Sequence, residues 1–283
     1  MINKEGLAAG AERGPCPSLQ GLALRDRYAA CGNARAEPTA PRISVVIPAL
    51  NEARNLPYVF ANLPRDMYEV ILVDGHSTDH TVAVARSLYP DVRIVSQTRR
   101  GKGNALACGF AACRGDIIVM VDADGSADGA EIPRFVATLQ RGADFAKGSR
   151  FIRDGGSADL TLLRRLGNWG LNLLVNILYG TRYTDLCYGY NAFWAHCLPY
   201  IHVDCDGFEV ETLINIRIAQ AGLRIAEVPS FESPRIHGVS NLNPWRDGWR
   251  ILKTILSERV ACRSACAPQP ALSAELEQEG GVA

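Results

Sequence analysis

The stretch Asp116-Ile-Ile-Val-Met-Val121, followed at once by Asp122-Ala-Asp124-Gly125-Ser126, decides how this chain folds. A short apolar run that ends in polar residues and a glycine is typical of a strand buried in a parallel sheet. Side chains two positions apart in an extended segment point the same way, so the carboxylates of Asp122 and Asp124 can face one ligand. Two such oxygen donors, with Gly125 permitting close approach, suit Mg2+ or Mn2+. The alternative is structural: aspartates after a strand often cap the next helix, as Asp128 could.

The same strand pattern recurs before this stretch. Apolar runs at 43–47, 70–73, 92–95 and 117–121 alternate with helix-like segments near 55–63, 79–88 and 103–113. This alternation predicts βαβ units and a three-layer α/β/α sandwich with a mostly parallel central sheet. Ligands of such sheets bind outside the carboxyl ends of the strands. The polar segments that follow the strands, at 48–52, 74–77, 98–103 and 122–126, are therefore expected to meet at one edge.

After residue 150 the alternation loosens. The pattern predicts helices at 160–179, 209–221 and 245–259, a strand at 224–228 and a polar segment at 184–193. Residues 1–40, rich in Ala, Gly, Pro and Arg, are expected to form a disordered leader, and residues 261–283 a disordered tail. There is no internal repeat. We therefore expect one domain over residues 41–260, with halves at 41–150 and 151–260.

Composition excludes several classes of protein. Thirty basic residues balance thirty acidic ones, which argues against a nucleic-acid binder. Nine cysteines without a C-x-x-C pair indicate free thiols and a reduced cytosol. We find neither an N-terminal apolar segment typical of a signal peptide nor a run of about 18 apolar residues that would span a membrane. The expected location is therefore cytoplasmic, either soluble or peripheral to a membrane.

Motifs in a fixed order resemble those of family 2 glycosyltransferases, and most of all the dolichol-phosphate (polyprenyl-phosphate) sugar synthases. They are Val45-Val-Ile-Pro48-Ala-Leu-Asn51-Glu52, Val73-Asp74-Gly-His-Ser77-Thr-Asp79-His-Thr81, Gly101-Lys-Gly-Asn-Ala105 and Asp122-Ala-Asp124. The match covers about residues 42–260. It implies a GT-A (Rossmann-like) fold, a nucleotide-sugar donor, a divalent metal and inversion at the anomeric carbon. Residues 41–150 then form the nucleotide-sugar half and 151–260 the acceptor half.

The resemblance also implies a donor site. Asp122 and Asp124 are the implied catalytic metal ligands, with His237 as a further ligand, and Mg2+ or Mn2+ would act as a Lewis acid on the leaving diphosphate. Two departures stand out: Asp74 is followed by Gly75 where relatives have a second aspartate, and Ser126 replaces a metal-contacting glutamine. The implied nucleotide-sugar contacts are Pro48, Asn51, Glu52, Asp74, Lys102, Asp122 and Arg235.

Some of these residues could instead have a purely structural role. Asn51 and Glu52 could simply cap the first helix, and Lys102 could be a solvated lysine at a helix start. Ser77 and Asp79 are interpreted as structural, capping the second helix.

Gly148-Ser149-Arg150 and the later pair Arg164-Arg165 resemble the arginines with which relatives bind a lipid phosphate, so the implied acceptor contacts are Arg150, Arg165 and Ser240. Arginine's planar fork suits bidentate phosphate contact. A phosphate acceptor is already anionic near neutral pH and needs no base, whereas a hydroxyl acceptor requires one. The best candidate for that base is Glu209, followed by Asp206, although both could belong to an ordinary acid-rich helix start.

Two apolar helices have two interpretations. The helix near 162–179 and the arginine-containing helix near 245–259 either pack into the core or lie at a bilayer interface, where Trp and Arg are favoured. The core interpretation is the one that we favour from the pattern alone. The apolar positions are Leu163, Leu166, Leu173, Leu174, Ile177, Leu178, Trp245, Trp249, Leu252, Ile255 and Leu256.

The predicted function is that of an inverting, metal-dependent glycosyltransferase that moves a sugar from a nucleotide diphosphate to a polyprenyl phosphate at the cytoplasmic face of a membrane. The second hypothesis keeps the donor chemistry with a hydroxyl acceptor. A sugar nucleotidyltransferase would need a glycine-rich signature at the first strand, which is absent. The intact pair of Asp122 and Asp124 argues against a catalytically inert nucleotide-binding module.

Overall fold

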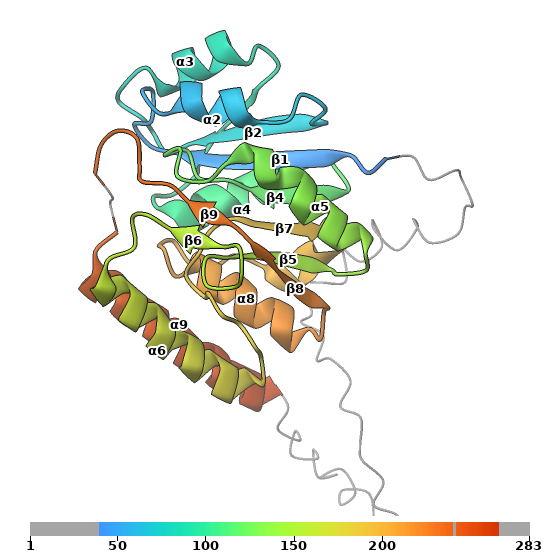
Figure 1. Cartoon of the computed structure of the whole chain (residues 1–283), viewed down its shortest axis with the longest axis vertical. Helices are drawn as coiled ribbons and strands as arrows, with labels where there is room; N and C mark the ends of the chain where they lie inside the picture. The colour runs from blue at the N-terminus through green and yellow to red at the C-terminus, as the bar shows by residue number, and fades with distance from the viewer. Residues whose placement is uncertain (1–39, 240–241, 266–283) are drawn as a thin grey trace, which may run out of the picture.

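A computed structural model of the chain describes residues 40–239 and 242–265 (Figure 1). The predicted leader up to residue 39, the acceptor candidate Ser240 and the predicted tail from residue 266 lie outside the described residues. Helix α9 (Pro244–Ala265) continues through residues 261–265, so these five positions are helical and the prediction of a tail from residue 261 is wrong there.

A seven-stranded sheet forms the centre of the molecule, in the order β3-β2-β1-β4-β7-β5-β8. Neighbouring strands pair in parallel except for β7, which runs antiparallel to both β4 and β5. A separate two-stranded sheet pairs β6 (Gly156–Ser157) with β9 (Phe231–Glu232). The strands of the large sheet are β1 (Ile43–Ala49), β2 (Glu69–Asp74), β3 (Arg93–Ser96), β4 (Ile117–Met120), β5 (Phe145–Ser149), β7 (Asn191–Trp194) and β8 (Ile225–Pro229).

Helices cover both faces of this sheet. Val45 and Ile47 of β1 pack on one side with α2 (Leu56–Asn62), α3 (Thr81–Leu88) and α5 (Ile132–Gln140). Val46 packs on the other side with α4 (Lys102–Ala112) and α8 (Val210–Gln220). Because successive side chains of a strand alternate between faces, the apolar run of β1 serves both layers. The prediction of a three-layer α/β/α sandwich with a mostly parallel sheet is confirmed. Short helical segments lie at η1 (Gly129–Glu131), η2 (Ala195–Cys197) and α7 (Leu198–Ile201).

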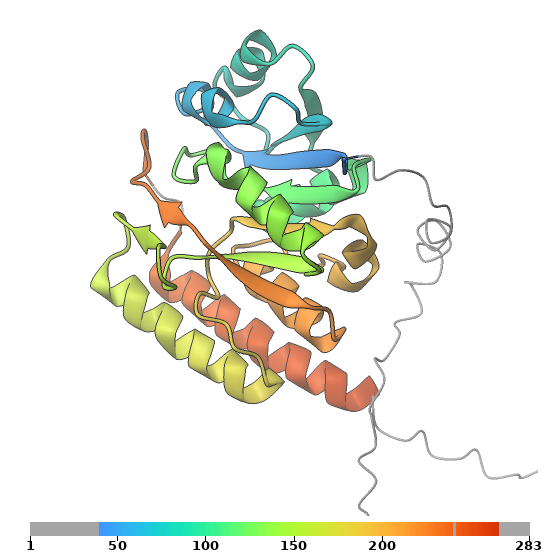
Figure 2. The same cartoon turned by 45° about the vertical axis from the view of Figure 1, so that its right-hand side comes forward.

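Two long helices form a further layer that the sequence pattern does not predict. Helices α6 (Leu162–Tyr179) and α9 lie side by side beyond α8, as both views show (Figures 1 and 2). They meet the body through a small cluster that joins Val175 of α6, Ile216 of α8, and Ile251 and Ile255 of α9.

Most of the other side of this pair faces solvent. Leu163, Leu166, Leu173 and Ile177 are 47–70% exposed, so the interpretation of these positions as core is wrong. On α9, Ile255 is fully buried, whereas Trp245, Trp249 and Leu256 are exposed. Leu174, Leu178 and Leu252 are half-buried.

Within the described ranges, none of the helices combines the length and apolarity that a membrane crossing requires. Cysteines 108, 113, 187, 197 and 205 are free thiols. Three of them, Cys108, Cys113 and Cys205, are half-buried and pack against the apolar layer between the sheet and α4 and α8, as expected for cysteine used as a small apolar residue.

Candidate active site

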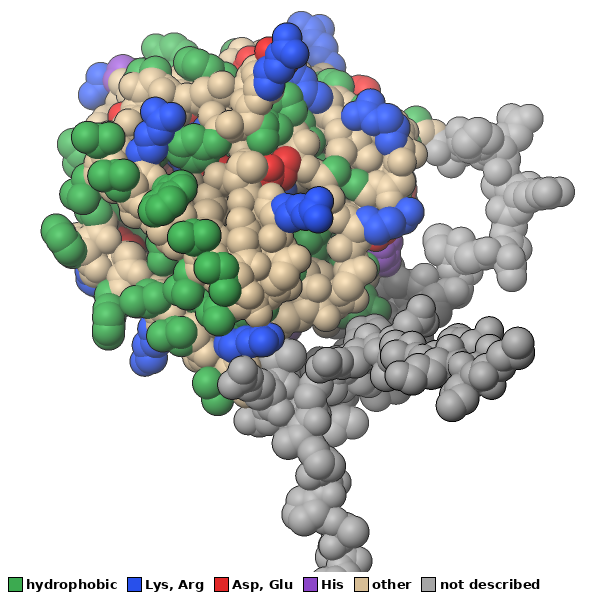
Figure 3. Space-filling view, turned by 60° about the horizontal axis from the view of Figure 1, so that its bottom comes forward, with side chains coloured by type: hydrophobic (Ala, Val, Ile, Leu, Met, Phe, Trp, Pro, Cys, Tyr) green, Lys and Arg blue, Asp and Glu red, His purple; other side chains and the backbone are tan. Residues whose placement is uncertain are grey.

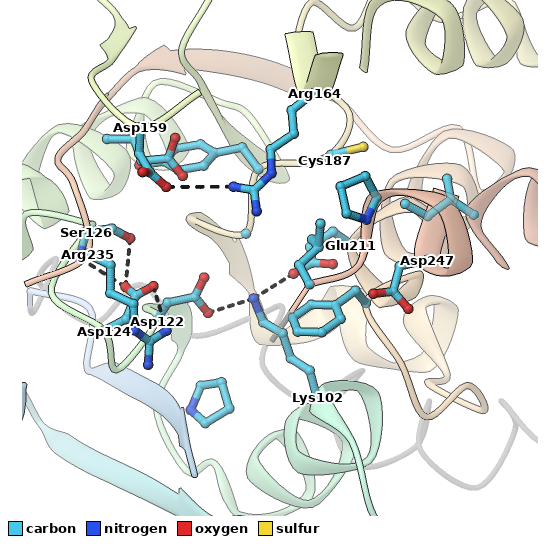
Figure 4. A pocket seen from close by; sticks show the side chains of 18 of the residues that line it. Lys102, Asp122, Asp124, Ser126, Asp159, Arg164, Cys187, Glu211, Arg235 and Asp247 are labelled. Atoms are coloured by element: carbon cyan, nitrogen blue, oxygen red, sulfur yellow. Dashed lines mark hydrogen bonds and ion pairs between the residues drawn. The ribbon is translucent and has the colours of Figure 1, made fainter. Parts of the chain in front are cut away.

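A cavity of about 540 Å3 opens at the carboxyl edge of the sheet. One part of its wall comes from the strand ends, with Pro48 in the last part of β1, Gly75 after β2, and Asp122 and Asp124 after β4. The opposite part comes from the beginnings of α6 and α9. The prediction that the polar strand ends meet at one edge therefore matches the structure for these segments (Figure 4).

Lys102 bridges two carboxylates in this cavity. Its Nζ lies 2.6 Å from Oδ1 of Asp122 and 2.7 Å from Oε1 of Glu211. Helix α4 begins at Lys102 and α8 carries Glu211, so the bridge joins two helices to the end of β4. Burial alone would lower the pKa of Lys102, but the two carboxylates more than offset it and raise that pKa. Lys102 is therefore a fixed cation beside the Asp122 carboxylate and not the solvated lysine of the alternative.

Gly189 leaves space next to this bridge. A Cβ at this position would lie 3.0 Å from Nζ of Lys102, 3.1 Å from Oε1 of Glu211 and 3.2 Å from Oδ2 of Asp122. Any side chain at position 189 would be too close to all three charged groups. Glycine here therefore lets Lys102 keep both ion pairs.

Asp124 is held by a turn and faces a second cation. Its Oδ1 accepts from the N–H and the hydroxyl of Ser126, at 3.0 and 2.7 Å. Its Oδ2 lies 3.5 Å from Nη1 of Arg235. Gly125 between them has φ +76°, and a Cβ there would lie 2.7 Å from Cδ1 of Ile236, so both the turn and the approach of the 235–237 segment require glycine.

Arg235 also pairs with Glu52, a buried carboxyl in the segment after β1. Burial raises the pKa of Glu52, while the hydrogen bond from Asn55 and the Arg235 charge oppose that shift. The guanidinium therefore joins the segment after β1 to the segment after β4 on the strand-end side of the cavity, where Asp122 and Asp124 also lie.

The neighbouring loop residues brace the backbone. Asn51 has φ +57°, and its Oδ1 accepts from the N–H of Thr78 at 2.8 Å. Asp74 accepts from the N–H of Ser77 at 3.2 Å. Neither Asn51 nor Glu52 caps α2, because its N-cap is Asn55 and makes no side-chain cap bond, so the capping alternative is wrong. Asn51 and Asp74 do not line the cavity, and their nucleotide contacts stay predictions.

Two structural interpretations hold. Asp79 accepts from the N–H of Thr81, the first residue of α3, at 2.9 Å, although the N-cap itself is His80. Asp128 caps η1 by accepting from the N–H of Ala130 at 3.0 Å, and it does not face the cavity with the aspartate pair.

Arg150 lines the cavity, but its guanidinium is already bound to two carboxylates. Nε and Nη2 donate to Asp185 at 2.7 and 2.9 Å, and Nη1 donates to Glu232 at 2.9 Å. Burial would lower the pKa of Arg150, and the hydrogen bonds and charges of both carboxylates raise it overall. The bidentate geometry that we expect for an acceptor phosphate is thus made with Asp185.

Of the two adjacent arginines on α6, Arg164 and not Arg165 reaches the cavity. Arg164 points into it from the first turn of the helix, with Nη1 3.7 Å from Asp159 (Figure 4). Arg165 is exposed, and its guanidinium lies 5.6 Å from the ring of Phe151.

Glu209 and His237 also differ from expectation. Glu209 is the N-cap residue of α8, and the carboxylate that lines the cavity is Glu211, two positions later. Asp206 pairs at 2.8 Å with Arg99. The ring of His237 lies 5.9 Å from that of Tyr58, and in the described parts of the chain no group of three or more His, Cys, Asp and Glu side chains is placed to hold a metal ion. The structure thus brings Asp122 and Asp124 together without His237.

Sequence reasoning missed several residues of this cavity. Gly189 and Glu211 lie within the segments predicted at 184–193 and 209–221, but the sequence assigns neither residue a function. A helix places positions 209 and 211 on different sides, so only packing decides which of the two acids faces the cavity. The others include Gln97, Asn168, Tyr188, Glu232 and Asp247.

The mixed sheet of this order and its flanking helices form a GT-A type α/β fold, which a solved glycosyltransferase structure shares. The model of the glycosyl transferase family 2 matches residues 44–200, and the chain belongs to this family.

Relatives and solved structures agree with this assignment. The chain is 29% identical to glycosyltransferase AglJ of Haloferax volcanii over 75% of this chain and 70% of that protein. It is 33% identical to the undecaprenyl-phosphate mannosyltransferase of Micrococcus luteus over 66% of this chain and 82% of that protein. Among solved structures, glucosyl-3-phosphoglycerate synthase of Mycobacterium tuberculosis in complex with Mn2+, UDP-glucose and glycerol 3-phosphate superposes with a TM-score of 0.60, at 26% identity over 78% of this chain and 81% of that one.

Proposed function

We propose that this glycosyltransferase moves a sugar from a nucleotide diphosphate to a polyprenyl phosphate, with inversion at the anomeric carbon. One observation carries the proposal: the strand-end side of the cavity is charged, whereas the side formed by α6 and α9 adds large apolar side chains to Asp159, Arg164 and Asp247. Asp122, Asp124 and Lys102 lie at the sheet edge, while Leu163, Leu171 and Trp245 line the region between α6 and α9. Such a cavity suits a reaction between a diphosphate and a phosphate that carries a long hydrocarbon chain. The Micrococcus relative is named for an acceptor of this kind.

The donor side fits a divalent cation. Asp122 and Asp124 are oxygen donors whose side chains are 35% and 22% exposed, so both can reach an ion in the cavity. Hard cations such as Mg2+ and Mn2+ prefer these ligands, with diphosphate and water completing the shell. When bound, the cation would neutralise the charge that develops on the leaving diphosphate. Lys102 and Arg235 would add fixed positive charge beside it.

The acceptor side would deliver an anionic nucleophile. A phosphate monoester oxygen needs no deprotonation near neutral pH, since its second pKa is about 6. It would form a C–O bond to the anomeric carbon as the C–O bond to the nucleoside diphosphate breaks on the opposite face. Arg164, which lines the cavity, would pair with the acceptor phosphate. The lipid would keep the enzyme at the cytoplasmic face of a membrane as a peripheral protein.

A hydroxyl acceptor is the second candidate. Glu211 favours it, because this carboxylate lies in the cavity and burial raises its pKa, opposed by the charge of Lys102. A base of raised pKa could take the proton of an attacking hydroxyl. The solved structure of glucosyl-3-phosphoglycerate synthase holds glycerol 3-phosphate beside UDP-glucose, and this soluble ligand is of a different class from a polyprenyl phosphate.

The test is release of nucleoside diphosphate from a panel of nucleotide sugars with Mg2+ or Mn2+. We expect polyprenyl phosphate in detergent to raise release at least tenfold, and the matched polyprenol, which lacks the phosphate, to have no effect. Stimulation by polyprenol or by a soluble glycerol phosphate alone would overturn the lipid-phosphate proposal.

Two acidic variants separate the acceptors further. Loss of a general base typically costs on the order of 10²–10⁴ in rate. With a phosphate acceptor, Glu209→Gln should leave turnover nearly unchanged, and Glu211→Gln should lower it less than that range. A loss of 10²–10⁴ in Glu211→Gln, with nucleotide-sugar affinity preserved, would favour the hydroxyl acceptor.

A further inference from the structure

We propose that α6 and α9 together form a docking surface for an anionic lipid bilayer. This surface, the α6–α9 face, consists of exposed apolar side chains interleaved with basic ones. Its apolar members on α6 are Leu162, Leu163, Leu166, Trp169, Leu173 and Ile177, and on α9 they are Trp245, Trp249 and Leu256.

Helix α6 has its polar side inward. Asn168, Asn172 and Asn176 repeat every four residues, as they do along one face of a helix, and all three bond to the segment 183–187. The amide of Asn176 donates to the carbonyl of Tyr183 at 2.8 Å and accepts from the N–H of the same residue at 2.9 Å. Val175, Leu171 and Leu178 share the inward side with these asparagines, whereas the exposed members listed above point away from the protein. A surface helix usually keeps most of its large apolar side chains inward, so α6 departs from that arrangement.

The outward side is apolar well beyond what scattered surface residues require. Trp169, Ile177 and Trp245 are 65%, 70% and 79% exposed. Figure 3 views the molecule from the side of α6 and α9 and shows hydrophobic side chains gathered there, with Lys and Arg around them. Contiguous exposed apolar surface with a polar rim marks an interaction site.

The charge among these side chains is positive. Arg246, Arg250 and Lys253 of α9 are exposed, beside the stripe of Trp245, Trp249 and Leu256. The one acidic residue in the first turn of α9, Asp247, is buried and accepts from the N–H of Asn243 at 2.8 Å. Its Oδ1 also lies 3.2 Å from Nε of Arg246 and 3.8 Å from Nη1 of Arg250, so one negative charge stands against the three positive ones and the net charge stays positive. Basic side chains with apolar stems beside tryptophan suit the interface of an anionic membrane, where the stems are buried and the charges meet lipid headgroups.

The α6–α9 face is continuous with the active-site cavity. Leu163 and Trp245 belong to both, since each lines the cavity and is more than half exposed. This step rests on the proposed function: a polyprenyl chain can stay in the bilayer under this face while its phosphate enters between α6 and α9. A second copy of the chain fits less well, because a two-fold contact would bring the basic stripe of α9 against its own copy.

The test is flotation of the full-length chain with vesicles, without donor or acceptor. We expect binding to vesicles of phosphatidylcholine with 30% phosphatidylglycerol and at least tenfold weaker binding to phosphatidylcholine alone. The triple variant Leu166→Gln, Trp169→Gln, Trp249→Gln should bind the anionic vesicles at least tenfold more weakly. None of these three side chains lines the cavity. The matched control is Leu88→Gln, since Leu88 is 44% exposed on α3 at the opposite end of the molecule (Figure 1) and should leave binding unchanged.

Three results would overturn the proposal. The wild-type chain could fail to float with anionic vesicles, the triple variant could float as well as the wild type, or sedimentation velocity could show a wild-type dimer that the triple substitution dissociates. The proposed function fails separately. If the enzyme transfers sugar to detergent-dispersed polyprenyl phosphate but does not bind vesicles, only the docking-surface proposal is refuted. If it binds vesicles but does not transfer sugar to this lipid, only the acceptor assignment is refuted.

Discussion

At the scale of single residues, the cavity carries its charges in pairs. Lys102 lies between Asp122 and Glu211, and Arg235 between Glu52 and Asp124. A nucleotide diphosphate with a cation would have to exchange these internal pairs for new ones. Binding energy from the ligand is therefore spent partly on releasing Asp122 and Asp124 from their ammonium and guanidinium partners.

Asp124→Asn tests the metal site with little change of shape. Removing the negative charge should lower transfer by a factor of at least about 10², because the side chain can no longer hold a divalent cation firmly. The measurement is nucleoside diphosphate release at saturating Mn2+, with the unfolding midpoint as a check of the fold. The control is Asp91→Asn at an exposed position before β3. Full activity of Asp124→Asn, or of the wild type in excess chelator, would remove the metal from the mechanism.

Arg150→Ala should reduce stability more than it reduces acceptor use. It would leave Asp185 buried with its main partner gone, and breaking a buried ion pair in this way costs roughly 3–5 kcal/mol. Urea denaturation measures the free energy of unfolding, and Arg165→Ala at the exposed neighbour should change it by less than about 0.5 kcal/mol. A stable Arg150→Ala that has lost only acceptor affinity would restore the direct phosphate contact that the sequence predicts.

The buried Lys147 should make the free energy of unfolding depend on pH. It is fully buried in β5, where its Nζ donates to the carbonyls of Gly148 and Tyr188 at 2.9 and 2.8 Å. Burial lowers its pKa from 10.5 to about 8, against the opposing charge of Asp185. Between these pH values the unfolded chain holds a proton that the folded chain has released, so this residue makes stability rise with pH there.

The check compares the wild type with Lys147→Met by urea denaturation from pH 8 to 10.5. Taking the difference cancels the titration of the cysteines and tyrosines. We expect the wild type to gain stability relative to the variant as the pH rises across this window. A difference that stays constant would mean that Lys147 titrates alike in the folded and unfolded chains.

At the scale of elements, periodicity predicts where helices and strands lie better than which way they face. The strands at 43–47, 70–73, 92–95 and 117–121 are all found as β1 to β4, with bounds shifted by a few residues. The alternation does not reveal α5, nor the four-residue β7 and its reversed direction, because pairing partners come from tertiary contacts. For α6 the leucines correctly predict a helix. They do not predict that the asparagines at 168, 172 and 176 lie on the side that faces the protein.

The inverted α6 gives a prediction at this scale. Asn176→Leu should destabilise the protein by about 1–3 kcal/mol, although it adds apolar surface, because the N–H and carbonyl of Tyr183 lose their partner. Leu166→Gln on the outward side should change the free energy of unfolding by less than about 0.5 kcal/mol. Both values come from urea denaturation in the absence of lipid. The opposite order would mean that α6 packs its leucines inward in solution.

At the scale of the whole molecule, the site draws on both halves of the chain. The aspartate pair and Lys102 come from before residue 150, and Glu211 and Arg235 from after it. The family motifs locate the first group because they follow strands in a fixed order. Arg235 is also among the contacts that the resemblance implies, but Glu211 depends on how α8 packs against the sheet, which spacing alone does not encode. The division at residue 150 into donor and acceptor halves stays a prediction.

Because both halves contribute, a donor should stabilise the whole chain. Nucleoside diphosphate at about 100 times its dissociation constant, with Mn2+, adds about 2.7 kcal/mol and should raise the melting temperature by roughly 5–10 °C. Differential scanning fluorimetry measures this shift. Mn2+ alone is the control and should have a smaller effect, and the Asp124→Asn variant should lose most of the shift. An equal shift in that variant would place the diphosphate away from the aspartate pair.

The reversed strand β7 has a consequence for synthesis on the ribosome. β5 has no hydrogen-bonded partner strand among those made before it, since its neighbours are β7 and β8. While the chain grows from Ser149 to Asn191, β5 lacks its partner strands and β4 presents an open, apolar edge, which is a template for pairing with another chain. Insertion of β7 closes both edges at once and delivers Gly189 to the active site. Nascent chains of this enzyme are therefore most prone to aggregate in that interval. One edge of β5 stays open until β8 pairs with it, and the site is complete only after Glu211 and Arg235 have been added.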